Sequence, residues 1–192
     1  YGDKFEMAYS INTRLSDNVS LSSIFGMARE QDTFLGSSGS GAYDLSGSEA
    51  LTNYLGFKTH IQINEGFSIN AASVLSNTEQ NLNNSDSLMS FESVRTSSFE
   101  LKAENNNEAR DDYWGVSLSQ PTRIENGEAI LNLVDSYDHL GNLHFKQKRQ
   151  NITPSARQLN MSVEYSKKIH DDKMINFAGI YSKYPGHSKD AK

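Results

Sequence analysis

The chain contains no cysteine and only three prolines among its 192 residues. The absence of cysteine excludes a disulfide framework and any thiolate metal site. No stretch approaches the roughly 18 consecutive apolar residues that a transmembrane helix needs, so no such helix is expected. A charged segment followed by an apolar core is also missing after Tyr1, and we therefore expect no secretory signal there.

Positive charge is scarce as well. Lysine and arginine total 18 against 24 aspartates and glutamates, which gives a net charge of −6. Phosphate backbones bind to clustered basic faces, and no basic cluster of that kind occurs, so we expect no nucleic-acid partner. The mean hydropathy of −0.62 is typical of a water-soluble chain. It does not exclude a transmembrane β-barrel, because every strand of such a barrel keeps one polar face.

Alternation of apolar and polar residues is the main signal that is present. From Lys4 to Leu15 the polar or small residues occupy the even positions. The odd positions carry Phe5, Met7, Tyr9, Ile11, Thr13 and Leu15. A period of two over such a length predicts a long strand with one apolar and one polar face.

Similar alternation recurs along the whole chain and predicts ten strands. They lie near residues 4–15, 19–28, 51–63, 67–75, 99–104, 114–119, 129–135, 143–148, 159–165 and 175–181, and the seventh and eighth are the weakest. No internal boundary divides them. We therefore predict one all-β domain over residues 1–192, built as an antiparallel up-and-down meander.

The connections between these strands favour an outer-membrane-type β-barrel. Residues 16–18 and 64–66 make short turns, whereas 29–50 and 77–96 are long, and the alternation is looser afterwards. Outer-membrane barrels have short turns at one end and long loops at the other. Strands of soluble sandwiches are usually only five or six residues long.

The same alternation leads to an expected strand number. If the long connections face outward, the first strand begins outside and the tenth ends outside. Closed bacterial barrels keep both ends on the periplasmic side and have an even number of strands. One further strand at each end gives about twelve, so we expect a piece of a twelve-stranded barrel that is incomplete at both ends.

Three segments resemble one protein family in order and spacing, over roughly residues 94–187. They are Trp114–Gly127 (WGVSLSQPTRIENG), Pro154–Leu159 (PSARQL) and Tyr181–His187 (YSKYPGH). They are similar to the C-terminal region of Gram-negative subtilisin-like serine peptidases of the autotransporter type, in which a peptidase passenger precedes a β-barrel translocator. The motif residues in turns are Gln120, Pro121, Arg123, Gly127, Pro185, Gly186 and His187. Residues 1–93 match the family only in style, and neither its peptidase part nor its terminal strand is present.

The resemblance implies a location and partners. It implies the outer membrane of a Gram-negative bacterium, with outer-membrane lipid, a covalently linked passenger domain and the barrel-assembly machinery as partners. It implies no catalytic residue within this chain.

Catalytic and cofactor chemistry is not predicted from the residues either. No G-x-S-x-G occurs, and the glycine-rich run from Gly36 to Gly41 predicts a flexible outer loop. His139 and His144 are five residues apart across a turn, which does not place them on one strand face. His187 stands beside Pro185 and Gly186, and we interpret it as a turn residue. We expect no enzyme activity, no metal and no cofactor.

The polar strand faces are the remaining candidates. We predict that eight charged or titratable residues face the lumen of the barrel: Lys4, Glu6, Arg14, Lys58, His60, Glu100, Lys102 and Glu164. A solvated sheet surface would carry the same residue types, and that alternative stays open. The aromatic residues Tyr9, Tyr54, Trp114, Tyr165 and Tyr181 fit membrane-interface girdles, but ordinary strands are also enriched in them.

Two hypotheses of different classes follow. The first is a non-catalytic translocator and anchor of a secreted subtilisin-like autotransporter peptidase. The second is a soluble secreted β-sandwich or β-solenoid module that binds glycans or a surface partner. A sandwich would remain soluble without detergent, whereas the barrel would require it.

Overall fold

The computed structural model describes residues 3–38, 40–81, 87–107, 111–170 and 173–189. In these residues the chain forms eleven strands and two short 3₁₀ turns, and every strand pairing is antiparallel. The strands are β1 (Lys4–Ser16), β2 (Val19–Gln31), β3 (Glu49–Gln62), β4 (Phe67–Asn81), β5 (Met89–Phe91), β6 (Val94–Asn107), β7 (Asp112–Asn126), β8 (Glu128–Tyr137), β9 (Leu143–Asn151), β10 (Leu159–His170) and β11 (Lys173–Lys183). The turns are η1 (Gly41–Tyr43) and η3 (Pro185–His187). The prediction of an all-β antiparallel meander is confirmed.

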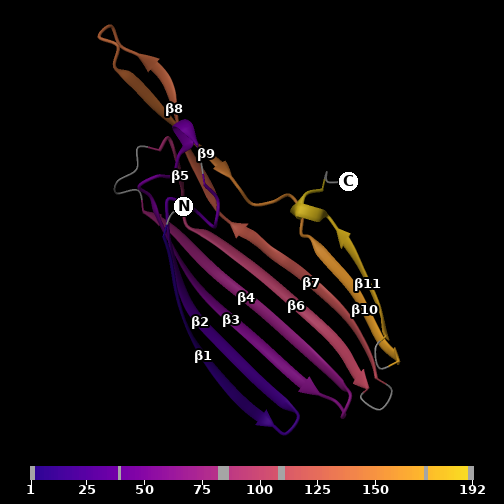
Figure 1. The fold of residues 1–192 in the computed structure, drawn as a ribbon. Coiled ribbons are helices and arrows are strands. Elements are labelled where there is room, and N and C mark those ends of the chain that lie inside the picture. The colour runs from indigo at the N-terminus through magenta and orange to yellow at the C-terminus, as the bar shows by residue number, and fades with distance from the viewer. Residues whose placement is uncertain (1–2, 39, 82–86, 108–110, 171–172, 190–192) are drawn as a thin grey trace.

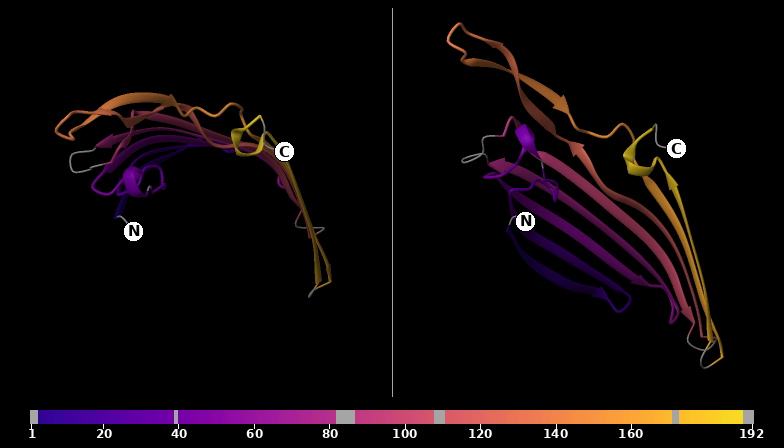
Figure 2. Two further views of the ribbon diagram at one scale, coloured as in Figure 1. Left: turned by 90° about the horizontal axis from the view of Figure 1, so that it is seen from above. Right: turned by 45° about the horizontal axis from the view of Figure 1, so that its top comes forward.

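Eight long strands form one curved sheet in the order β1-β2-β3-β4-β6-β7-β10-β11. Figure 1 shows these strands side by side, and Figure 2 shows that the sheet bends into an open arch. The edges of the arch are β1 and β11, which do not pair with each other in the described part of the chain. The sheet is therefore not closed into a barrel in this structure.

Short and long connections are separated between the two ends of the arch. Two to four residues join β1 to β2, β3 to β4, β6 to β7 and β10 to β11 at one end. The turn before β4 is held by Asn64, whose side-chain oxygen accepts hydrogen bonds from the backbone N–H groups of Gly66 (3.1 Å) and Phe67 (2.9 Å). The three long connections, which follow β2, β4 and β7, start at the other end (Figure 1). The alternation is thus more regular than the sequence alone indicates.

The prediction of ten strands in a single wall is wrong. The predicted strands near 129–135 and 143–148 exist as β8 and β9, but they form a separate three-stranded sheet with β5. Figure 1 shows this β8–β9 hairpin projecting from the end that carries the long connections. Only Gly127 separates β7 from β8, and a Cβ atom there would lie 2.9 Å from a methyl group of Val94. Alternation identifies a strand but not its partner, and the total of twelve loses its basis once the wall has eight strands.

The hydrophobic core is small and lies at the same end. Its buried residues are Phe34, Leu45, Ala50 and Val94, and Met89, Phe91, Ile124 and Ile152 pack against them. The rings of Phe34 and Phe91 stack with centroids 4.3 Å apart. The connection 32–48 is therefore anchored by buried side chains, which corrects the expectation of a flexible loop around Gly36–Gly41; residue 39 lies outside the described residues.

Candidate functional site

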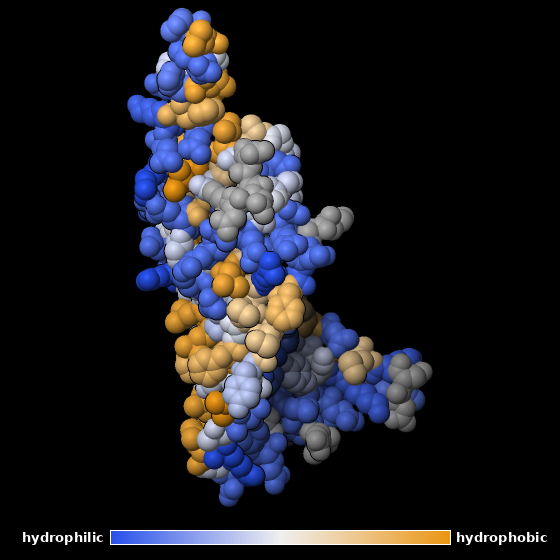
Figure 3. Space-filling model, turned by 90° about the vertical axis from the view of Figure 1, so that its left-hand side faces the viewer, coloured by the Kyte–Doolittle hydropathy of each residue, from blue (hydrophilic) through white to orange (hydrophobic). Residues whose placement is uncertain are grey.

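One face of the arch is apolar on all eight strands. The pairing register aligns Tyr9, Phe25, Leu55 and Leu75 in one row across β1 to β4, so their side chains share a face. The same parity continues to β11. The large apolar residues on this face that are at least 36 % exposed are Phe5, Met7, Tyr9, Ile11, Phe25, Phe57, Leu75, Phe99, Leu101, Trp114, Val116, Leu118, Met161, Val163, Tyr165, Ile175, Phe177 and Tyr181. In Figure 3 hydrophobic residues line the outer side of the lower sheet and hydrophilic ones its inner side, so the apolar face is the convex one.

The apolar zone on the convex face runs obliquely to the strands. On β1 it begins at Phe5 below the long connections, and on β11 it begins at Tyr181. The register places Tyr181 in the row of Thr13, eight residues further along β1 than Phe5. Eight residues correspond to about 26 Å along the strand and seven strand spacings to about 34 Å across the sheet. The ratio of these two lengths means that the strands are tilted by about 40° to the direction perpendicular to the apolar zone.

Aromatic residues gather at the lower edge of this convex face. Trp114, Tyr165 and Phe177 follow one another in a single row across β7, β10 and β11. The ring of Phe67 on β4 lies 5.8 Å from that of Trp114. Tyr54, for which the sequence allows either a girdle or an ordinary strand position, lies on the opposite face, where its hydroxyl donates to Glu6 (2.9 Å). Tyr54 occupies an even position in β3, as Lys58 and His60 do, and this shared parity is the sequence feature that indicates the polar face.

All eight residues predicted to face a lumen lie on the concave, polar face. The register places Arg14, His60 and Lys102 in one row and Lys58 and Glu100 in the next. Lys4, Glu6 and Glu164 share the same parity in their strands. The sequence-based assignment of these side chains to one face of the sheet agrees with the structure.

Only some of these eight residues contact one another. The ammonium of Lys102 lies 3.7 Å from Glu164, and that of Lys4 lies 4.0 Å from Glu6. The other partners are residues that the sequence analysis did not single out: Arg14 pairs with Asp17 (3.0 Å), and His60 contacts Asn70 (2.9 Å) and Gln62 (3.1 Å). Lys58 and Glu100 have no ion pair with any described residue, and Ala72 lies between them in their row.

A polar network that the sequence analysis missed surrounds Lys102. Its ammonium lies 3.0 Å from Glu104, which also accepts hydrogen bonds from Asn70 (2.9 Å) and from the Tyr113 hydroxyl (3.1 Å). The tyrosine ring occupies the space above Gly115, where a Cβ atom would lie 2.7 Å from the hydroxyl oxygen. A tyrosine two residues before a glycine in the same strand is the signal that could have indicated this packing.

The three segments of the family resemblance meet in the structure. The Arg123 guanidinium donates to the backbone carbonyls of Pro154 (2.9 Å) and Ala156 (3.0 Å). It also pairs with Glu125 (2.6 Å), which receives a second ion pair from Arg157 (2.8 Å). These contacts hold the connection between β9 and β10 against the end of β7.

The third segment joins this cluster through His187, which is buried. Its Nδ1 accepts a hydrogen bond from the backbone N–H of Gln158 (2.9 Å), so Nε2 carries the proton and donates to the carbonyl of Thr122 (3.1 Å). Gly186 adopts a left-handed conformation (φ 64°) in η3, which glycine tolerates best. His187 thus lies in the turn η3, as its position beside Pro185 and Gly186 predicted.

The remaining motif residues have separate roles. Gln120 is buried and donates to the Ser97 carbonyl (3.2 Å), while its side-chain oxygen accepts from Arg157. Pro121 lies where the β6–β7 register shifts, and having no N–H it suits an interrupted ladder. Gly127 packs beneath Val94, and Pro185 begins η3.

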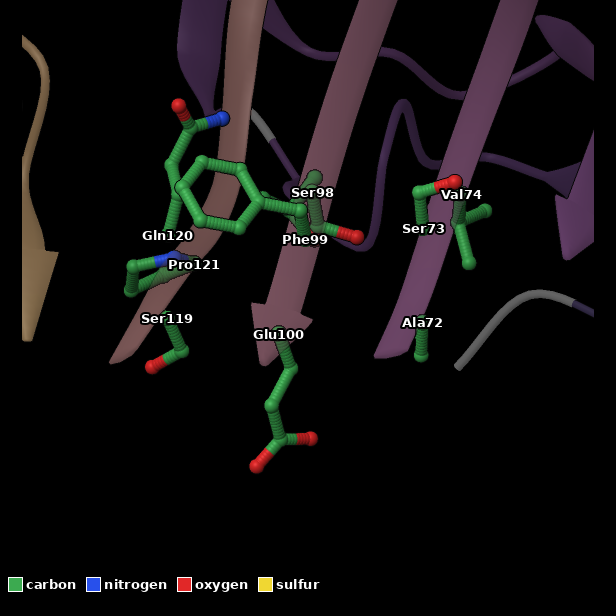
Figure 4. Close-up of a pocket in the computed structure, with 10 residues that line it drawn as sticks. Ala72, Ser73, Val74, Ser98, Phe99, Glu100, Ser119, Gln120 and Pro121 are labelled. Carbon is green, nitrogen blue, oxygen red and sulfur yellow. The ribbon is translucent and has the colours of Figure 1, made fainter. Parts of the chain in front are cut away.

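The register shift opens a shallow hollow of about 400 Å³ between β4, β6 and β7. Figure 4 shows the ring of Phe99 beside Gln120, with Glu100 pointing away from that ring. Glu100 is the only ionisable residue in the lining, so no acid–base pair is present in this hollow. It lacks the features of a catalytic pocket.

Among the described residues, no helix has the length and apolar character required to cross a bilayer. Within the described ranges no group of three or more His, Asp or Glu side chains is arranged to hold a metal ion. Comparisons with protein-family models, with curated proteins and with solved structures find no match to this chain.

Proposed function

We propose that this chain is a non-catalytic wall segment of an outer-membrane β-barrel that translocates and anchors the passenger of a subtilisin-like autotransporter peptidase. One observation carries the proposal. The apolar face of eight adjacent strands is exposed, and no described element packs on it. Exposed apolar patches on soluble monomers rarely exceed a few hundred Å², so a face of this extent requires another apolar environment.

The course of the apolar zone supports a bilayer as that environment. Strands of transmembrane barrels tilt by about 35–45° and carry an apolar band about 25 Å tall, flanked by aromatic girdles. The tilt of about 40° derived from the band falls in this range. The row of Trp114, Tyr165 and Phe177 occupies the place of one girdle.

The concave face supports the lumen assignment. Several of its charges make opposite-sign contacts, such as that between Lys102 and Glu104, and the small residues Ser22 and Ala72 flank Lys58 in its row. A polar interior of this kind suits a hydrated passage. The regular separation of short turns from long connections fits the same architecture, with the long connections at the cell exterior.

The role in secretion rests on the family resemblance. The resemblance is supported by the contacts among its three segments, which are distant in sequence but meet through Arg123, Arg157 and His187. The soluble sandwich remains the alternative function. A sandwich buries its apolar face against a second sheet, and in the described ranges no sheet covers the convex face.

Trp114 provides the experiment, because it is the single tryptophan of the chain and lies on the convex face, 40 % exposed. The full chain is refolded into vesicles whose lipids carry bromine on the acyl chains. We expect strong quenching of Trp114 fluorescence by brominated lipid and weak quenching by aqueous acrylamide. A chain that stays soluble without detergent and is quenched only by acrylamide would refute the membrane assignment and favour the sandwich.

A further inference from the structure

Basic residues collect at one sector of the upper border of the apolar zone. On the convex face, Arg95 lies four residues beyond Phe99 on β6, and Lys183 lies two residues beyond Tyr181 on β11. Arg157, two residues before β10, reaches Gln120 and Glu125 near the end of β7. Arg95 is in the row of Met7, so it points to the same side as the apolar zone. Its side chain makes no hydrogen bond or ion pair with any described residue.

The neighbouring carboxylates do not neutralise this sector. Glu125 accepts a hydrogen bond from Ser97 (2.5 Å) and ion pairs from Arg123 and Arg157, so its oxygens are occupied. Glu79 accepts a hydrogen bond from Asn77 (3.2 Å) and makes no ion pair with the described residues. The four cations of this sector, Arg95, Arg123, Arg157 and Lys183, therefore share one ion-paired carboxylate, that of Glu125, and the side chain of Arg157 remains 47 % exposed.

The corresponding border on β1 to β4 is different. Its only arginine, Arg29, is paired with Glu49 at 2.7 Å, and Asp3 and Glu79 add negative charge. The excess of positive charge is therefore local to β6–β11. It stands out because the chain as a whole carries a charge of −6.

We propose that Arg95, together with Arg157 and Lys183, binds the phosphate groups of phosphorylated lipid headgroups in the leaflet on the side of the long connections. Guanidinium groups donate charge-assisted hydrogen bonds in a planar fork that matches phosphate oxygens. Phe99 and Leu118 lie immediately below, where the acyl chains of the same lipid would run. The inference rests on the proposed function, since it requires the convex face to lie in a bilayer.

The test uses the full chain refolded into phosphatidylcholine vesicles that contain lipid A with its phosphates, and the same vesicles with dephosphorylated lipid A. Binding of the labelled lipid A is measured by energy transfer from Trp114. We expect Arg95→Ala to weaken binding of phosphorylated lipid A about fivefold, from the roughly 1 kcal/mol that one basic residue contributes near a charged surface. Arg95→Glu should weaken it further, and neither variant should change binding of the dephosphorylated lipid.

Arg29→Ala is the matched control, because this arginine lies at the same border in the other sector and should leave binding unchanged. Inorganic phosphate at millimolar concentration should not compete; if it does, the site binds free phosphate and the lipid assignment is wrong. Equal binding by wild type and Arg95→Glu, with both inserted in the bilayer, would overturn the inference and leave the proposed function intact. If the wild type does not insert, as judged by brominated-lipid quenching, the proposed function fails and the inference with it.

Discussion

The ring of Tyr54 on β3 lies directly over Gly26 on the neighbouring β2, and a Cβ atom at Gly26 would overlap the ring. The same tyrosine reaches across β2 to donate a hydrogen bond to Glu6 on β1 (2.9 Å). Tyr54 thus links β3 to β1 across Gly26 of β2 on the concave face.

The first prediction concerns this packing. Gly26→Ala forces the ring out of place and should lower the free energy of unfolding by about 1–3 kcal/mol, measured by urea unfolding. Gly56→Ala is the control, because a Cβ atom there meets its nearest neighbour at 3.5 Å, an ordinary contact. Truncating the ring in Gly26→Ala/Tyr54→Ala should recover part of the loss. Equal effects of the two glycine variants would show that the ring does not constrain Gly26.

The second prediction compares the two faces of the sheet. Val163 lies on the convex face, 40 % exposed, and pairs with Gly179; the adjacent pair on the concave face is Glu164 with Ala178. Val163→Lys should destabilise the inserted protein by about 2–4 kcal/mol near the bilayer midplane. Ala178→Lys adds the same charge opposite a carboxylate and should have little effect. Urea titration of both variants in lipid vesicles measures the difference, and equal stabilities would contradict a lipid-facing convex surface.

Much of this two-faced arrangement could be predicted from sequence, because strand parity is a local property. The odd positions of β1 and all eight polar-face residues followed from alternation alone. The partner of a strand is not local, and β8 and β9 alternate like wall strands although they pair in a separate hairpin. The contacts of Arg123 with two backbone carbonyls also depend on how the connection folds back, which no sequence pattern shows.

The third prediction tests this Arg123 cluster. Arg123→Ala would leave the carbonyls of Pro154 and Ala156 without these donors and remove one partner of Glu125, so we expect a loss of about 2–4 kcal/mol. Arg123→Lys keeps the charge but cannot bridge both carbonyls, and should recover less than half of the loss. Limited proteolysis between residues 150 and 158 reports the release of the connection. Arg149→Ala, at an exposed ion pair of the hairpin, should cost less than about 1 kcal/mol and leave the cleavage rate there unchanged.

The last prediction concerns the turn of the β8–β9 hairpin, which Asp138 organises. The Asn142 side chain (2.7 Å) and the backbone N–H groups of Asn142 (2.9 Å) and Leu140 (2.8 Å) donate to its carboxylate and lower its pKa below the usual value. A pKa that is lower in the folded than in the unfolded state stabilises the turn above the unfolded pKa of about 3.9, and this stabilisation is lost as the pH falls through the folded value. An NMR titration of the Asp138 carboxyl should therefore show a midpoint below that of an unstructured aspartate. Asn142→Ala should move the midpoint upward, whereas His139→Ala, which removes no donor to this carboxylate, should not. A midpoint at the ordinary value in the wild type would show that the turn is not held by this carboxylate.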